Sequence, residues 1–229
     1  HLPAPSRAVS GIDAGGDVAP ASIVADVAEG IRWFARHPVL RVLATLVGGF
    51  ALLQSTTLGV LVVHAVDQLG LSASSYGVFL GVIAVGNVVG ALVAAPIRER
   101  ASPAAVLGAA GALAGGAYLG VAALDGAVLV ALLLVVEAFA VACGSVVSTS
   151  LRQATVPDEL RGRVGNAYRS CLWGVTPLGA LLGGALASVA GTRVVFAVAG
   201  GLQLVLTAAL APRLARRLGE SSPATAARE

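Results

Sequence analysis

One carboxylate lies deep inside an otherwise apolar stretch of this sequence. Glu137 stands in the run LLLVVEAFAVACG, where a charge surrounded by hydrocarbon costs about 2.5–3.5 kcal/mol. Such a residue must face protein or water, or carry a proton. This position is typical of a proton-coupling or substrate-binding carboxylate. A structural acid that is bonded to a neighbouring helix meets the same constraint.

Two amides, Gln54 and Asn87, also fall near the middle of apolar runs. Counted from the ends of those runs, both lie at a depth similar to that of Glu137. Three polar groups at one level are consistent with a central cavity. They are equally consistent with hydrogen bonds between helices, which are worth about 0.6 kcal/mol each. We therefore take Glu137, Gln54 and Asn87 as candidates for proton coupling or for the lining of a substrate cavity.

The composition of the chain indicates that a membrane surrounds these residues. Of its 229 residues, 57% are hydrophobic and 12% are charged, whereas soluble domains average about 45–50% and about 25%. Disorder requires low hydrophobicity and high charge, which is the opposite balance. Nucleic-acid binders gather their basic residues on one soluble face, but here the basic residues stand between apolar runs. We therefore predict an integral membrane protein that binds no nucleic acid.

Six apolar runs are long enough to cross a bilayer, which takes about 20 residues. They predict an all-α membrane protein with a six-helix transmembrane domain over residues 41–212. The six predicted spans are residues 42–65, 74–97, 103–124, 127–151, 164–190 and 194–211.

The segments outside these runs are polar or amphipathic. Residues 1–20 are rich in Pro, Gly, Ala and Ser and have no apolar period, which indicates a flexible cytoplasmic linker. Residues 21–40 repeat apolar side chains at helical spacing, with charges on the other faces. This pattern predicts an amphipathic helix at the membrane surface. Residues 213–229 read as a polar cytoplasmic tail.

Arginine marks one side of the predicted bundle. All 15 basic residues are Arg, and most stand before the first span, after the sixth, or in the second–third and fourth–fifth loops. The alternate loops contain Asp67, Asp125 and Arg193. Because cytoplasmic loops carry an excess of basic residues, we predict a multi-pass protein of the cell membrane with both chain ends in the cytoplasm.

Glycine pairs predict where the helices pack most closely. Gly86 and Gly90 lie four residues apart in the second span, and Gly179 and Gly183 in the fifth. Small residues at this spacing let two membrane helices approach through their backbones. The same pairs suit helices that slide against one another and helices that are packed tightly and do not move.

The sequence contains no recognisable catalytic constellation. The motifs GxSxG, HExxH and GxGxxG are absent, and a P-loop would need a Lys, which the chain lacks. Cys143 and Cys171 lie inside apolar runs and have no metal-binding spacing. We expect no enzymatic activity, no metal site and no cofactor.

The most distinctive stretch joins the fourth and fifth spans and reads VPDELRGRV, followed by PLGALLGG. Pro157 suits the first turn of a helix, and Asp158 suits its positive dipole end. Arg161, Gly162 and Arg163 then return the chain to the membrane. The stretch resembles the loop between the tenth and eleventh helices of the major facilitator superfamily. It is most similar to the branch of drug-efflux and enterobactin exporters, whose entry to the seventh helix the lead-in EGIRWFARHPVLR also resembles.

A weaker similarity follows the second span. Gly86, Gly90, Arg98 and Arg100 stand where this family repeats a cytoplasmic motif after the second helix of each half. The full motif contains an Asp that this sequence lacks.

The resemblance implies the C-terminal half of a transporter, helices seven to twelve. Such a protein would be a secondary active, proton-coupled exporter, or antiporter, of small molecules that works by alternating access. Its partners would be a small-molecule substrate, protons, the lipid bilayer and an N-terminal six-helix half. Gln54, Asn87 and Glu137 would then lie on helices seven, eight and ten, around the central cavity.

A second hypothesis is a six-span scaffold or homodimeric assembly protein without transport activity. The sequence begins at His1 and contains no Met, which favours the half-transporter, as does the linker-like composition of residues 1–20. The reading frame upstream of His1 separates the two hypotheses.

Overall fold

The computed structural model describes residues 37–156, 158 and 161–220. Within these residues, six helices are long and apolar enough to cross a membrane, as the sequence predicts. The fold is that of an all-α membrane protein with six spans. The helices are α2 (Pro38–Val63), which the short π-helix η1 (His64–Gln68) continues, α3 (Ala73–Arg100), α4 (Pro103–Ala123), α5 (Ala127–Thr155), α6 (Arg161–Ala190) and α7 (Thr192–Glu220).

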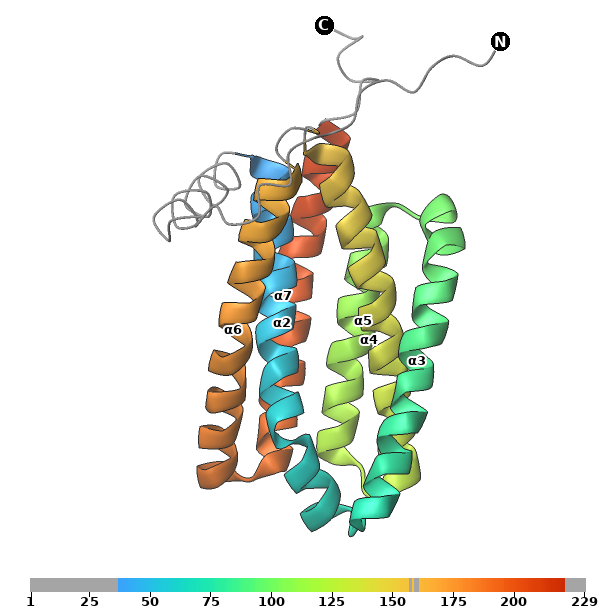
Figure 1. Ribbon diagram of the computed structural model, residues 1–229, viewed down its shortest axis with the longest axis vertical. Helices are drawn as coiled ribbons and strands as arrows, with labels where there is room; N and C mark the ends of the chain where they lie inside the picture. Colours follow the sequence, from blue (N-terminus) through green and yellow to red (C-terminus); the bar gives the residue numbers. More distant parts are fainter. Residues whose placement is uncertain (1–36, 157, 159–160, 221–229) are drawn as a thin grey trace, which may run out of the picture.

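The six helices form two groups of three. Helices α2, α6 and α7 lie side by side, and α3, α4 and α5 form the other group (Figure 1). The main contacts run in the order α6, α2, α7, α4, α5, α3, so that α4 and α7 join the two groups. We call the end where α2 begins and α7 ends the arginine end, because it carries Arg41, Arg100, Arg152 and Arg217. The other end, which holds the α4–α5 turn, is the far end.

Local sequence determines where the helices begin and turn. Pro38 starts α2, at a position where a missing N–H costs nothing. Ser72 and Ser102 cap α3 and α4, and each side chain accepts a backbone N–H at 3.3 Å. At the far end, Gly126 and Gly191 have φ angles of 105° and 85°, which favour glycine over residues with a Cβ.

Two helix boundaries differ from the sequence prediction. Residues 38–40 begin the membrane helix α2 rather than ending an interfacial helix, and the predicted segments 1–20 and 21–36 lie outside the described residues. At the other terminus, α7 continues past residue 212 to Glu220. The cause is a row of leucines at helical spacing, because Leu210 and Leu214 are buried and Leu218 packs beside them.

The apolar core divides into two clusters, one at each end of the bundle. The arginine-end cluster comprises Val39, Leu40, Leu43, Leu46, Ala104, Val106, Leu107, Val147, Val156, Leu210 and Leu214. The far-end cluster comprises Val60, Leu61, Phe79, Tyr118, Val121, Val130, Ala131, Leu134, Val195, Phe196 and Ala199.

Candidate functional site

Glu137 is the centre of a hydrogen-bonded group inside the bundle. Its side chain is only 7% exposed. Its Oε1 atom accepts a hydrogen bond from the hydroxyl of Tyr118 at 2.7 Å and one from Nε2 of Gln54 at 3.2 Å. The three side chains come from α5, α4 and α2, so the group joins three helices. Two donors on one carboxyl oxygen offset part of the cost of burying it.

The second carboxyl oxygen of Glu137 has a different environment. Among the described residues, Oε2 has no hydrogen-bond partner. Glu137 is also one of the residues that line the cavity described next. A carboxyl group that is held at one oxygen in the wall of a cavity can bind and release a proton without losing its position.

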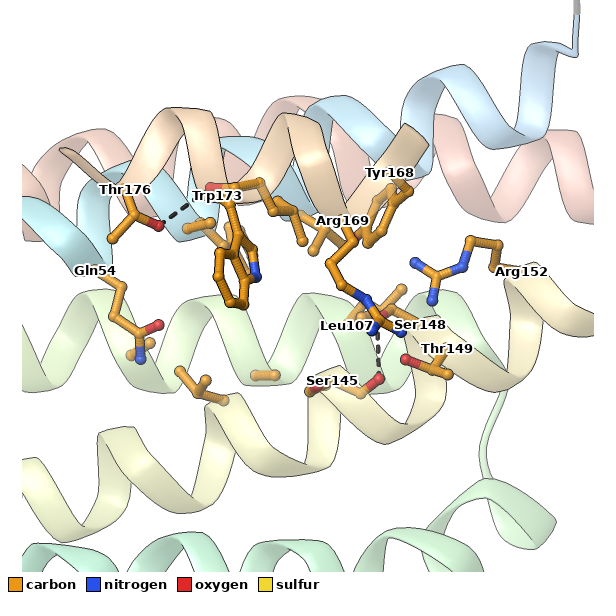
Figure 2. Close-up of a pocket in the computed structure, with 18 of the residues that line it drawn as sticks. Gln54, Leu107, Ser145, Ser148, Thr149, Arg152, Tyr168, Arg169, Trp173 and Thr176 are labelled. Carbon is orange, nitrogen blue, oxygen red and sulfur yellow. Dashed lines mark hydrogen bonds between the residues drawn. The ribbon is translucent and has the colours of Figure 1, made fainter. Parts of the chain in front are cut away.

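That space is a cavity of about 620 Å³. Side chains of α2, α4, α5, α6 and α7 line it, and its wall follows one face of α5 from Glu137 to Arg152. These two residues are fifteen positions apart on the helix, which at about 1.5 Å per residue is about 22 Å. Figure 2 shows Gln54 at one end of the cavity and Arg152 at the other. The cavity therefore connects the buried carboxyl group with the arginine end.

The cavity is open on the side of α6. Trp173 lines it, and yet its side chain is 75% exposed. In Figure 2 the indole stands between α6 and the cavity space, near Gln54. A buried polar group, an aromatic wall and an opening to one side can bind a small molecule and exchange a proton next to it.

Asn87 does not join this group. Its side chain is exposed on α3, and it is not among the residues that line the cavity. Gly86 turns toward α5, and the next residue lies about 100° further round the helix. All three residues lie at similar depth in the membrane. Gln54 contacts Glu137, whereas Asn87 faces another direction.

The loop motif is described in part. Pro157 lies outside the described residues, and Asp158 is exposed between α5 and α6. Arg161, Gly162 and Arg163 form the first turn of α6, at the arginine end. Of these, Gly162 lines the cavity at its arginine end, which we call the mouth of the cavity.

Arg98 and Arg100 lie exposed in the last turn of α3. They stand apart from the lining of the cavity. Cations in this position interact favourably with the negative end of the helix dipole.

Gly86 and Gly90 lie where α3 meets α5. A Cβ at either position would collide with a backbone carbonyl oxygen, that of Val135 or that of Phe139. In the same contact, Sγ of Cys143 donates a hydrogen bond to the carbonyl oxygen of Gly90 at 3.0 Å. The glycines therefore permit backbone contact between these two helices.

Gly179 and Gly183 have the same role in the contact between α6 and α2 as Gly86 and Gly90 have between α3 and α5. A Cβ at Gly179 would overlap Oγ of Ser55, and one at Gly183 would overlap the carbonyl oxygen of Thr56. Since α2 carries Gln54 and α6 carries Trp173, this contact determines the distance between two walls of the cavity.

Two arginines of the cavity were missed as site residues at the level of sequence. Arg152 and Arg169 line its mouth, whereas in the sequence they count only as charges that orient the membrane helices. For Arg152 a signal was present, because Glu137, Val141, Ser148 and Arg152 recur at helical spacing along one face of α5. Arg169 could be predicted to line the cavity only if the rotation of α6 about its own axis were known.

The described residues contain no group of three or more His, Cys, Asp or Glu side chains that could hold a metal ion. The lining of the cavity provides carboxyl, guanidinium, hydroxyl, amide and aromatic groups.

Comparison with known proteins agrees with the geometry. The family model of the Major Facilitator Superfamily matches residues 44–229. Searches among curated proteins and among solved structures gave no match. The matched region spans most of α2 and all of the other five membrane helices, with the cavity between them. A six-span bundle with a central cavity, matched over most of its length by this model, belongs to the Major Facilitator Superfamily and is a transporter-type membrane protein.

Proposed function

We propose that this chain is the C-terminal half of a proton-coupled exporter of small molecules. The observation that carries the proposal is Glu137, which is buried, held at one oxygen by Tyr118 and Gln54, and part of the lining of the cavity. A carboxyl group inside a membrane protein most often belongs to an ion or substrate pathway. We infer that Glu137 is the group that exchanges protons during transport.

The coupling follows from the cost of a charge at this depth. When the cavity is closed to water, an ionised Glu137 costs several kcal/mol unless a proton or a cationic group neutralises it. The carboxyl group therefore favours closing in its protonated form. When the cavity reopens on the side with less acid, it releases the proton. A substrate that leaves while the proton enters is then driven by the proton gradient.

The opening of the cavity beside α6 supports the proposal that a second half is present in the complete transporter. Trp173 of α6 lines the opening, and its side chain is 75% exposed. Transporters of this kind bind substrate between two repeats at the middle of the membrane. We propose that an N-terminal six-helix half covers this side, and that the VPDELRGRV loop assigns the protein to the branch of drug-efflux and enterobactin exporters.

The transport activity is tested in cells that lack their own major efflux pumps. The full-length protein is expressed, and the accumulation of fluorescein, ethidium and Nile red is followed by fluorescence. We expect at least one of these anionic, cationic and neutral dyes to accumulate less than in cells with an empty vector. A protonophore is expected to abolish the difference. Accumulation of all three dyes that is equal with and without the protein, or that ignores the protonophore, would contradict the proposal.

The orientation is tested by labelling single cysteines. Ser102 and Asp125 are both exposed, in turns at opposite ends of the bundle. In a background in which Cys143 and Cys171 are replaced by alanine, Ser102→Cys is expected to be protected from an impermeant maleimide in whole cells. Asp125→Cys is expected to react with it. Labelling of both residues from the same side would be incompatible with the proposed topology.

A further inference from the structure

The mouth of the cavity is positively charged. Arg152 of α5 and Arg169 of α6 both line it, and Figure 2 shows both side chains directed into the space between these helices. The guanidinium carbon of Arg152 lies 4.0 Å from the centre of the Tyr168 ring. This cation–π contact holds the Arg152 side chain at the mouth. Two cations from different helices thus meet the same entrance.

No negative group of the described lining offsets this charge locally. Glu137 is the one carboxylate among the described residues that line the cavity. It stands about 22 Å from Arg152 along α5, which is too far for an ion pair between them. The two arginines therefore give this end of the described lining a positive charge.

The remaining walls suit the body of an organic molecule. Phe50, Leu172 and Trp173 provide apolar and aromatic surface, while Ser145 and Thr149 add polar groups to the α5 wall of the cavity (Figure 2). A guanidinium group binds a carboxylate, sulfonate or phosphate through paired hydrogen bonds. The apolar walls would contact the rest of such a molecule.

We propose that the substrates of this transporter are amphipathic organic anions, with the anionic group bound by Arg152 and Arg169 and the apolar part packed against Phe50 and Trp173. This inference rests on the proposed function, because it assigns a substrate class to the same cavity.

Trp173 provides a reporter inside the site. The chain contains two tryptophans, of which Trp33 lies outside the described residues. In the full-length protein, with Trp33 and any other tryptophan replaced by phenylalanine, energy transfer from Trp173 to a bound dansyl group measures occupancy. Dansylglycine, dansylglycinamide and dansylcadaverine carry the same fluorophore with a charge of minus one, zero and plus one. The protein is reconstituted in vesicles of phosphatidylcholine, which have no net charge.

We expect dansylglycine to bind at least about tenfold more tightly than the other two probes, since a hydrogen bond to a charged group contributes about 1.5–3 kcal/mol. Replacing Arg152 or Arg169 with glutamine should each weaken dansylglycine about tenfold and leave dansylglycinamide nearly unchanged. Arg216→Gln is the matched control, because Arg216 is exposed at the same end of the bundle but does not line the cavity. It should change neither affinity.

Equal binding of the three probes to the wild type would overturn the proposal, even if the arginine variants failed to fold. A lipid phosphate is a second possible source of the anion. If short-chain dihexanoyl phosphatidylglycerol displaces dansylglycine where dihexanoyl phosphatidylcholine does not, the site binds headgroups and the assignment to soluble organic anions falls. The substrate class and the transport activity are rejected by different results. Dye efflux that depends on protons but shows no anion preference rejects this inference alone, whereas dansylglycine binding without any dye efflux rejects the proposed function.

Discussion

Cells that produce the protein with Glu137→Gln are expected to accumulate a transported dye to the same level as cells that produce no transporter. Glutamine has nearly the shape of glutamate, and its Oε1 atom can still accept the hydrogen bonds from Tyr118 and Gln54. The fold is therefore expected to survive. What is lost is the proton, because an amide does not titrate in the physiological range.

Two further measurements distinguish a coupling role from a structural one. In vesicles with dye on both sides and no pH gradient, the Glu137→Gln protein should still exchange dye across the membrane, because exchange requires no net movement of protons. Glu99→Gln removes an exposed acid at the end of α3 and is the matched control. It should leave efflux unchanged. Efflux by the Glu137→Gln protein that still follows the pH gradient would assign the buried carboxyl a purely structural role.

The number and order of the membrane helices could be predicted from the sequence, because hydrophobicity over about 20 residues is a strong local signal. The ends were less predictable. The last turns of α7 contain Arg213, Arg216 and Arg217, which read as a polar tail. They are helical because Leu214, between these arginines, is fully buried against the arginine-end cluster. The charges of this segment indicate a polar tail, whereas the helical spacing of its leucines indicates a continued helix. The structure has the helix.

The sequence predicts how deep in the membrane each candidate residue lies, but not in which direction its side chain points. Gln54 and Glu137 meet because they lie at one level and on facing sides of α2 and α5. Asn87 lies at a similar level but faces away from the cavity. Sequence position gives the height of a residue in a membrane helix, whereas its direction depends on which side of the helix is packed. On α3 that side is set by Gly86 and Gly90.

The arginines of the cavity are a second case in which the sequence does not predict the direction of a side chain. Arg152 and Arg169 obey the excess of basic residues on the cytoplasmic side, which already accounts for their presence in the sequence. Only the packing of α6 against α2 places Arg169 opposite α5, across the cavity from Arg152. A residue can therefore orient a helix and line a binding site at once, and the first role conceals the second.

We expect the close contact between α6 and α2 to require glycine at position 183, because this residue has no Cβ. A Cβ at this position would overlap the carbonyl oxygen of Thr56, and a backbone atom within a helix cannot turn aside as a side chain can. Gly183→Ala should therefore push α6 away from α2 and lower the free energy of unfolding by about 1–3 kcal/mol, the usual cost of overpacking. Unfolding in detergent, followed by circular dichroism, measures this change.

The adjacent glycine provides the control. A Cβ at Gly184 would have no neighbour within 4 Å, and alanine is favoured over glycine in a helix by up to about 1 kcal/mol. Gly184→Ala should thus be neutral or slightly stabilising. The two variants differ by one position on the same helix, so a difference between them reports contact with α2 rather than helix propensity or lipid solvation. If Gly183→Ala were as stable as Gly184→Ala, the backbone contact would not hold α6 in place, and the wall that carries Arg169 and Trp173 would need another support.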